Sequence, residues 1–267
     1  TFMGLLLALY LWMGDSLAEG VANVSEWYFE TFATDESSTE GLFEDYDQPN
    51  TRVTHMTVDH ELPLTFWRAV GHSYSAFAKE SMIDELAQAA GMDEVAFRLQ
   101  NTQNSPRLNN VIRVAGERMA NMEVPAGHHL GFAAHHSFRT DVAEIAEVSV
   151  ENGKIRVHKV TCVLDCGQAV NPDIVRSQME GGVIYGLTAA LYGGLNLENG
   201  AIKESNFHDY PMLRMDESPE IEVIIIDSGT KPTGVGEPGL PPIAPAVANA
   251  VYKATGQRLR SLPLQLA

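Results

Sequence analysis

Residues 234–246 read GVGEPGLPPIAPA and contain a single ionisable side chain, Glu237. Two glycines, Gly234 and Gly236, allow tight or left-handed turns just before this carboxylate. The prolines lead into an apolar helix that we expect over residues 247–255. A carboxylate on a rigid glycine and proline loop at a helix start is typical of a positioned general base. The alternative is a first-turn glutamate that interacts only with the helix dipole.

A second segment, residues 165–187, reads DCGQAVNPDIVRSQMEGGVIYGL. Asn171 and Pro172 predict the N-cap and the first position of a helix that continues to Leu191. Three glycines fall within this helix, and each costs about 1 kcal/mol relative to alanine. Such a cost indicates that something approaches this helix closely. It is either another backbone, for example that of a packed helix, or a bulky ligand.

A third segment, WRAVG at residues 67–71, places Arg68 ahead of a glycine turn. An arginine in this position is most often a surface salt-bridge partner. The turn leads into a helix expected over residues 75–90, because apolar side chains recur there with the helical period.

The three segments, with ATGQRLRSLP at residues 254–263, resemble the C-terminal end of the large, molybdopterin-binding subunit of the molybdenum hydroxylases. This is the xanthine dehydrogenase and aldehyde oxidase group. Within it, the chain most resembles the branch of the isoquinoline 1-oxidoreductase beta subunits. The resemblance covers residues 41–267. It implies roles for six residues: Glu237 as catalytic base, Gln178, Gly234 and Gly236 as cofactor contacts, and Arg68 and Gly71 in the substrate pocket.

The resemblance also implies a reaction, a cofactor and partners. The reaction is the hydroxylation of an N-heterocycle or an aldehyde with water as the oxygen source. The cofactor is molybdopterin, in the cytosine dinucleotide form, with no side chain of this chain bound directly to the metal. The partners are the N-terminal half of the large subunit, a small subunit or domain that carries 2Fe–2S clusters, and a small-molecule substrate.

Two loops of these large subunits, Gly-Gly-x-Phe-Gly and Gly-Gln-Gly, have no match in the chain. We therefore expect a fragment that does not hold the cofactor tightly by itself. One alternative is a non-catalytic half that only folds and docks with a separate cofactor-binding chain. Another is a metal-free acid–base enzyme that uses Glu237. The sequence leaves the substrate open, and it fits the cytoplasm and the periplasm equally well.

The formal net charge of −17 argues against a nucleic-acid binder, because phosphate contacts need clustered lysine and arginine. The apolar start at residues 2–13 is too short to span a bilayer and lacks a basic leader region, so a buried helix is expected there. Two cysteines, Cys162 and Cys166, exclude a disulfide framework and do not have zinc-site spacing. We interpret both as structural thiols, and His135 and His136 as structural because neighbours on a strand face opposite ways.

The mixture of helices and strands lacks a regular βαβ rhythm, so we predict an α+β fold with antiparallel or mixed sheets. This architecture would be part of the molybdenum cofactor-binding domain. Three regions are expected: 1–50 with an apolar helical start and an acidic loop, 51–125 with helices, and 126–267 as the α+β cofactor-facing domain. The individual expectations are helices over 5–33, 94–99 and after Pro106, strands over 51–59, 142–150, 155–164 and 221–226, and hairpin turns at 152–153 and 199–200.

Overall fold

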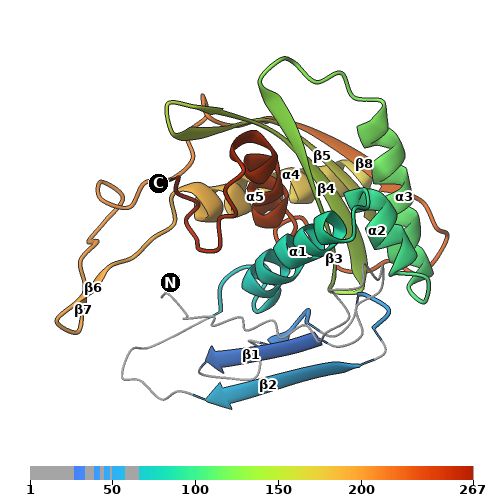
Figure 1. The fold of residues 1–267 in the computed structure, drawn as a ribbon, viewed down its shortest axis with the longest axis horizontal. Helices are drawn as coiled ribbons and strands as arrows, with labels where there is room; N and C mark the ends of the chain where they lie inside the picture. Colours follow the sequence, from blue (N-terminus) through green and yellow to red (C-terminus); the bar gives the residue numbers. More distant parts are fainter. Residues whose placement is uncertain (1–26, 34–38, 43–44, 49, 58–65, 267) are drawn as a thin grey trace.

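The computed structural model describes residues 27–33, 39–42, 45–48, 50–57 and 66–266. Its centre is a four-stranded sheet in the order β3-β4-β5-β8 (Figure 1). The first three strands are antiparallel, and the last one lies parallel to β5. The strands are β3 (His128–Ser137), β4 (Thr140–Glu151), β5 (Lys154–Asp165) and β8 (Glu220–Ile226).

Five helices pack around this sheet, so the predicted α+β class is confirmed. They are α1 (His72–Ala89), α2 (Glu94–Gln100), α3 (Pro106–Ala120), α4 (Pro172–Leu191) and α5 (Ile243–Thr255). One face of the sheet is covered by α3 and the other by α5, with α1 and α4 packed against α5 (Figure 1).

Successive side chains along each strand point to opposite faces of the sheet, and helices cover both faces. Phe132, Ala143 and Ile145 pack on the α3 face with apolar residues of that helix. Ala133 and Ala146 pack on the opposite face with α4 and α5. Because β4 has helices on both sides, its residues are buried almost without interruption, as expected for a strand covered on both faces.

Local sequence signals explain where the two site-bearing helices begin. The side chain of Asn171 accepts hydrogen bonds from the N–H groups of Asp173 and Ile174, which confirms it as the N-cap of α4. Helix α5 begins at Ile243, four residues earlier than predicted. Pro245 fits there because the first helical N–H groups need no intrahelical partner. At the far end, Gly256 adopts φ 74° and closes α5.

The expected helix over 5–33 is wrong for its last part, because β1 (Trp27–Ala33) pairs in parallel with β2 (Thr51–Thr57). Aromatic and apolar runs form strands as readily as helices, so periodicity alone did not separate the two. Residues 1–26 lie outside the described part of the chain. The turn predicted at residues 199–200 is confirmed between β6 (Leu197–Glu198) and β7 (Ala201–Ile202).

None of the helices in the described residues has the length and apolar character needed to cross a bilayer.

Candidate active site

Arg68 joins the glycine loop (residues 231–237) to helix α4 through its guanidinium group. Its Nε donates to the main-chain oxygen of Gly236 at 2.9 Å, and Nη2 donates to the same oxygen. Nη2 also lies 3.3 Å from Oε1 of Gln178 and 3.4 Å from the main-chain oxygen of that residue. Arginine suits this position because its planar fork presents several N–H donors at fixed angles.

Glu237 is held by the turn that carries Arg68. The N–H of Ala69 donates to Oε1 of Glu237 at 3.0 Å. Ala69 and Val70 have φ values of 70° and 47°, in the left-handed region that β-branched residues rarely adopt. Such a conformation costs on the order of 1–3 kcal/mol per residue and is found mainly at functional sites. The strained turn therefore directs a main-chain donor at the candidate base.

Main-chain and threonine contacts fasten the glycine loop to the sheet. The N–H of Thr233 donates to the oxygen of Cys166 at 2.9 Å, at the end of β5. The N–H of Gly234 donates to the oxygen of Phe138 at 3.2 Å, and Thr140 Oγ1 donates to the oxygen of Gly234 at 2.7 Å. The loop is thus held between the end of β5 and the β3–β4 turn.

Asp165 organises the turn that leads from β5 toward helix α4 and Gln178. Its Oδ1 accepts hydrogen bonds from Arg107, from the N–H of Gly167 and from the hydroxyl of Ser228. Burial by itself raises the pKa of Asp165, but these hydrogen bonds and the arginine charge outweigh burial and lower that pKa. An ionised carboxylate therefore fixes the approach to α4.

The glycines of α4 divide into two kinds. A Cβ added at Gly182 would lie 2.9 Å from the carbonyl carbon of Gly239, and one at Gly186 would crowd the adjoining segment. These positions allow close backbone approach. Gly181 is exposed, and a Cβ there would meet only the Arg68 guanidinium, 3.8 Å away. Its outer surface is open, next to the polar groups of the site.

The structure thus brings together Arg68, Gln178 and the loop of Gly236 and Glu237. Gly71, the other residue predicted for a substrate pocket, is buried and directly precedes α1. The functional roles of these residues stay predictions. The N–H of Ala69 was not foreseen, because a main-chain donor leaves no signature in residue type.

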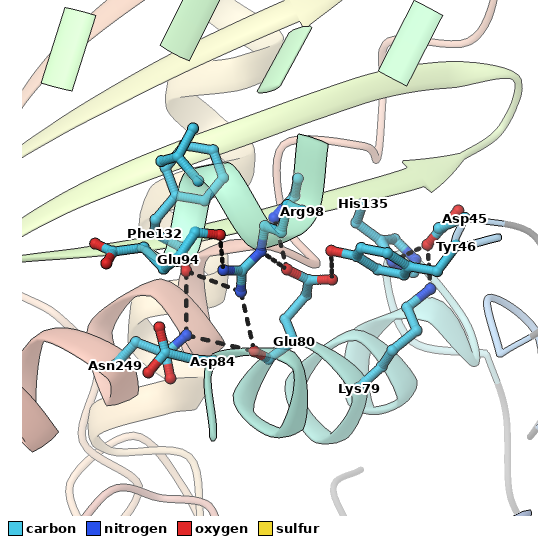
Figure 2. Close-up of polar contacts among 12 residues, drawn as sticks. Asp45, Tyr46, Lys79, Glu80, Asp84, Glu94, Arg98, Phe132, His135 and Asn249 are labelled. Atoms are coloured by element: carbon cyan, nitrogen blue, oxygen red, sulfur yellow. Dashed lines mark hydrogen bonds and ion pairs between the residues drawn. The ribbon is translucent and has the colours of Figure 1, made fainter. Parts of the chain in front are cut away.

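A buried polar network lies between α1, α2, β3 and α5 (Figure 2). Glu80 accepts from Arg98 Nε at 2.9 Å and from the hydroxyl of Tyr46 at 2.7 Å. Asn249 Nδ2 donates to the oxygen of Phe132 at 3.1 Å. Burial by itself lowers the pKa of Arg98, but the charges of Glu80, Tyr46 and Asp84 and the hydrogen bond to Glu80 together outweigh burial and raise that pKa. These hydrogen bonds and the Arg98–Glu80 ion pair join α1 to α2, and Asn249 of α5 to Phe132 on β3.

The two adjacent histidines point to opposite sides of β3, as predicted. His135 Nε2 shares a hydrogen bond with His72 Nδ1 at 3.0 Å, whereas His136 Nδ1 lies 2.7 Å from Oδ1 of Asp141. Burial and the neighbouring His135 lower the pKa of His72 to about 3, so this ring is neutral near pH 7. Within the described ranges no three histidine, cysteine or acidic side chains are grouped as metal ligands.

Glu144 is a buried carboxyl group on β4. Its side chain is 0% exposed, and neither carboxyl oxygen has a hydrogen-bond partner of good geometry. Cys162 is its register partner on β5. Burial raises the pKa of Glu144 well above its usual range, and burial likewise raises the pKa of the Cys162 thiol. Both cysteines are free and buried, as expected for structural thiols.

Family models of known proteins match most of the chain that carries this site. A model described as the molybdopterin cofactor-binding domain matches residues 67–219, and a second model of the same description matches residues 24–102. The chain belongs to the molybdopterin cofactor-binding domain family. The glycine-rich helix α4 lies inside the first match, and the turn at Arg68 lies inside both.

Curated members of this family include relatives with clear sequence similarity. The isoquinoline 1-oxidoreductase beta chain from Brevundimonas diminuta is 36% identical over 92% of this chain and 32% of its own length. One of the subunits of nicotinate dehydrogenase from Pseudomonas putida is 32% identical over 82% of this chain and 20% of its own length. The chain therefore spans about a third or less of the length of these relatives.

Solved structures share the fold of this molybdopterin cofactor-binding domain. Quinoline 2-oxidoreductase from Pseudomonas putida 86 superimposes with a TM-score of 0.78 at 11% identity, over 89% of this chain and 58% of that one. Aldehyde oxidoreductase from Desulfovibrio gigas gives a TM-score of 0.72 at 16% identity, over 89% of this chain and 46% of that one. At these identities the likeness establishes the fold.

The residues at the site fit a large polar cofactor. Gly181 and Gly236 are exposed, and a Cβ at either would have no heavy atom of the protein closer than 3.8 Å. Gln178 lies between them, half-buried, with its oxygen engaged by Arg68 and its amide nitrogen as a further donor. A bulky group with hydrogen-bond acceptors can therefore approach this backbone closely.

Proposed function

We propose that this chain is the C-terminal part of a molybdenum-dependent oxidoreductase that hydroxylates N-heterocycles or aldehydes, with Glu237 as the general base. The observation that carries the proposal is the meeting of Arg68, Gln178 and Glu237. Arg68 and Gln178 are 110 residues apart in sequence, yet their side chains are hydrogen-bonded. A carboxylate, a guanidinium and an amide beside exposed glycines match the needs of proton transfer next to a bound cofactor.

In the proposed reaction the substrate carbon gains the oxygen of one water molecule, and two electrons and two protons are released. When bound, the molybdenum cofactor supplies the two-electron oxidation. Glu237 takes one of the protons. Its Oε1 is held by the N–H of Ala69, so Oε2 is the atom that accepts the proton. A general base of this kind contributes about 10²–10⁴ in rate.

The other residues position this base and the cofactor. Arg68 fixes the main-chain oxygen of Gly236 and keeps the carboxylate of Glu237 at a constant place relative to α4. Gln178 uses its amide N–H groups to hold the cofactor while its oxygen stays engaged with Arg68. Gly234 and Gly236 allow the glycine loop to turn close to the bound group.

We further propose that the cofactor is in the cytosine dinucleotide form and that partner chains complete the enzyme. Large apolar side chains are exposed around the site: Phe66 is 75%, Ile174 57% and Tyr185 43% exposed. Exposed apolar groups near a site are typical of a surface that another chain covers. We assign this cover to the N-terminal half of the large subunit, and electron removal to a 2Fe–2S subunit or domain.

The alternative is a non-catalytic half that only folds and docks with a separate cofactor-binding chain. The same exposed apolar surface supports it, and so does the fact that the chain spans only part of the length of its relatives. In that case the chain folds and binds its partner without chemistry. Turnover by the assembled complex that depends on Glu237 excludes the alternative.

Isotope labelling tests the proposed reaction. The assembled enzyme would be incubated with quinoline-type, isoquinoline-type and aldehyde substrates in ¹⁸O-labelled water, and the products analysed by mass spectrometry. We expect one ¹⁸O atom per product molecule from the heterocycles, at least one from the aldehydes, whose carbonyl oxygen itself exchanges with water, and molybdenum in the active preparation. Label arriving from ¹⁸O₂ instead, or full activity without molybdenum, would contradict the proposal.

A further inference from the structure

The turn that presents Ala69 to Glu237 is in a conformation that its own residues disfavour. Ala69 and Val70 both have positive φ values, 70° and 47°. For residues with a Cβ, and above all for a β-branched residue, this region is rarely populated. A turn of this kind persists only where its surroundings hold it. Something outside the turn must therefore keep the Ala69 N–H directed at Glu237.

Glu40 is one of the groups that hold the turn from outside. Its Oε2 accepts a hydrogen bond at 3.1 Å from the N–H of Gly71, the residue that directly follows the strained pair. Helix α1 has no side-chain N-cap of its own and no acidic residue in its first turn. The Glu40 carboxylate thus lies where the N-terminal end of a helix favours negative charge. On the inner side, Ser73 Oγ donates to the oxygen of Val70 at 2.8 Å.

The segment that carries Glu40 is itself anchored along α1. Ser75 Oγ donates to the main-chain oxygen of Glu40 at 2.5 Å. Lys79, one turn further along the helix, donates to the oxygen of Gly41 and pairs with Asp45, and both side chains of this pair are buried (Figure 2). The apolar side chain of Leu42 packs into the core beside α1. The main chain that carries the Glu40 carboxylate is therefore held in place along α1.

We infer that Glu40 is a positioning residue for the candidate base, acting through the turn at Ala69. The inference rests on the proposed role of Glu237. The chain of contacts runs from the Glu40 carboxylate to the Gly71 N–H, through the left-handed pair, to the Ala69 N–H and Oε1 of Glu237. Without the carboxylate the turn relaxes toward negative φ, and the Ala69 N–H rotates away from Glu237.

Two substitutions at Glu40 and one control separate this role from general stability. Glu40→Ala removes the acceptor, whereas Glu40→Gln keeps an amide oxygen that accepts the same N–H. Asp47→Ala is the matched control. Its carboxylate also accepts a main-chain N–H, that of Asn104 at 2.9 Å, but away from the turn. Ser73→Ala is a second variant, which loosens the turn from its inner side without changing residues 39–42.

The measurements are hydrogen exchange of the Ala69 amide in the assembled enzyme and steady-state turnover. In Glu40→Ala we expect the Ala69 amide to exchange about tenfold faster and turnover to fall about tenfold, with KM unchanged. A factor of about ten is the effect of losing one hydrogen bond. Ser73→Ala shifts both in the same direction. Glu40→Gln restores most of both, and Asp47→Ala alters neither.

Unchanged exchange at Ala69 in Glu40→Ala would overturn the inference. So would unchanged turnover in Glu40→Ala under conditions where Glu237→Gln is inactive. Retention of turnover by Glu237→Gln refutes the base role instead, and the exchange measurement then still decides whether Glu40 holds the turn.

Discussion

The main-chain N–H of Ala69 and the carboxylate of Glu237 are joined by a 3.0 Å hydrogen bond between segments 168 residues apart in sequence. This contact bears on the alternative explanation of Glu237 as a first-turn helix residue. Helix α5 begins at Ile243, after three further prolines, so Glu237 lies outside its first turn. The effect of a helix dipole decreases within one turn. The contact with the opposing turn therefore accounts for the placement of the carboxylate better than the dipole does.

Arg68→Lys tests whether the guanidinium fork matters. A lysine ammonium is a point charge that cannot serve the acceptors on Gly236 and Gln178 in one fixed geometry. We expect turnover to fall about 10-fold or more, since charge-assisted hydrogen bonds contribute about 1.5–3 kcal/mol and their loss frees Gly236 and Gln178 from their fixed positions. The control is Arg176→Lys, an exposed ion-pair residue on α4, which should leave turnover unchanged. Equal turnover in both variants would show that Arg68 is only a surface cation.

Glu144→Gln tests the buried carboxyl group through its pH dependence. The pKa of Glu144 is raised in the folded state, so its stabilising contribution is fully present below the pKa of the unfolded chain, about 4.3. That contribution is lost as pH rises. We therefore expect the free energy of unfolding of Glu144→Gln, relative to the wild type, to increase from pH 4 to pH 8 in denaturant titrations.

The control for this experiment is Glu147→Gln on the same strand. Glu147 has a partner, because its Oε1 lies 2.6 Å from Nδ1 of His128. Its removal should bring no gain in stability at neutral pH. A relative stability of Glu144→Gln that stays flat with pH would mean that the carboxyl group is not held in its protonated form.

Two adjacent glycines give opposite predictions. Gly182→Ala places a Cβ 2.9 Å from the backbone of Gly239 and should cost about 1–3 kcal/mol of unfolding free energy, in the range of an overpacked core. Gly181→Ala on the exposed side of α4 should gain up to about 1 kcal/mol from helix propensity. Calorimetry on both variants measures the difference. A similar response at the two positions would contradict the close approach of Gly239 to α4.

Lys79→Met removes one partner of a buried ion pair. The Asp45 carboxylate would be left buried without its cation, and breaking such a pair costs about 3–5 kcal/mol. Lys159→Met is the control, because that lysine pairs with Glu220 near the surface and such pairs contribute about 0–1 kcal/mol. Chemical denaturation compares the two. Equal costs would show that the Lys79 pair behaves like a surface pair.

Much of the fold could be predicted from local signals, because several elements carry their own boundaries. Asn171 with Pro172 marks the start of α4, and Asn152 with Gly153 marks the β4–β5 turn. The prediction of a helix over residues 27–33 is wrong because an apolar and aromatic run has no unique period. The start of α1 at His72 was placed three residues late, since the preceding turn uses left-handed alanine and valine.

The candidate site was predictable in its side chains and not in its connections. Arg68, Gln178 and Glu237 each stand in a recognisable motif. What joins them is a main-chain N–H, two main-chain oxygens and a carboxylate, that of Glu40, in a different part of the sequence. Main-chain groups are the same in every residue, so their use depends on tertiary structure, which local patterns do not encode.

Turnover of Glu237→Gln in the assembled enzyme is the sharpest test of whether Glu237 is the general base. Glutamine keeps the shape and the oxygen that accepts the Ala69 N–H, but it cannot take up the proton. We predict a loss of about 10²–10⁴ in turnover, the range for a general base, with molybdenum content and melting temperature close to those of the wild type. Glu180→Gln, at an exposed acid on α4, is the control and should keep full turnover. Near-normal turnover of Glu237→Gln with molybdenum bound would show that Glu237 is not the base.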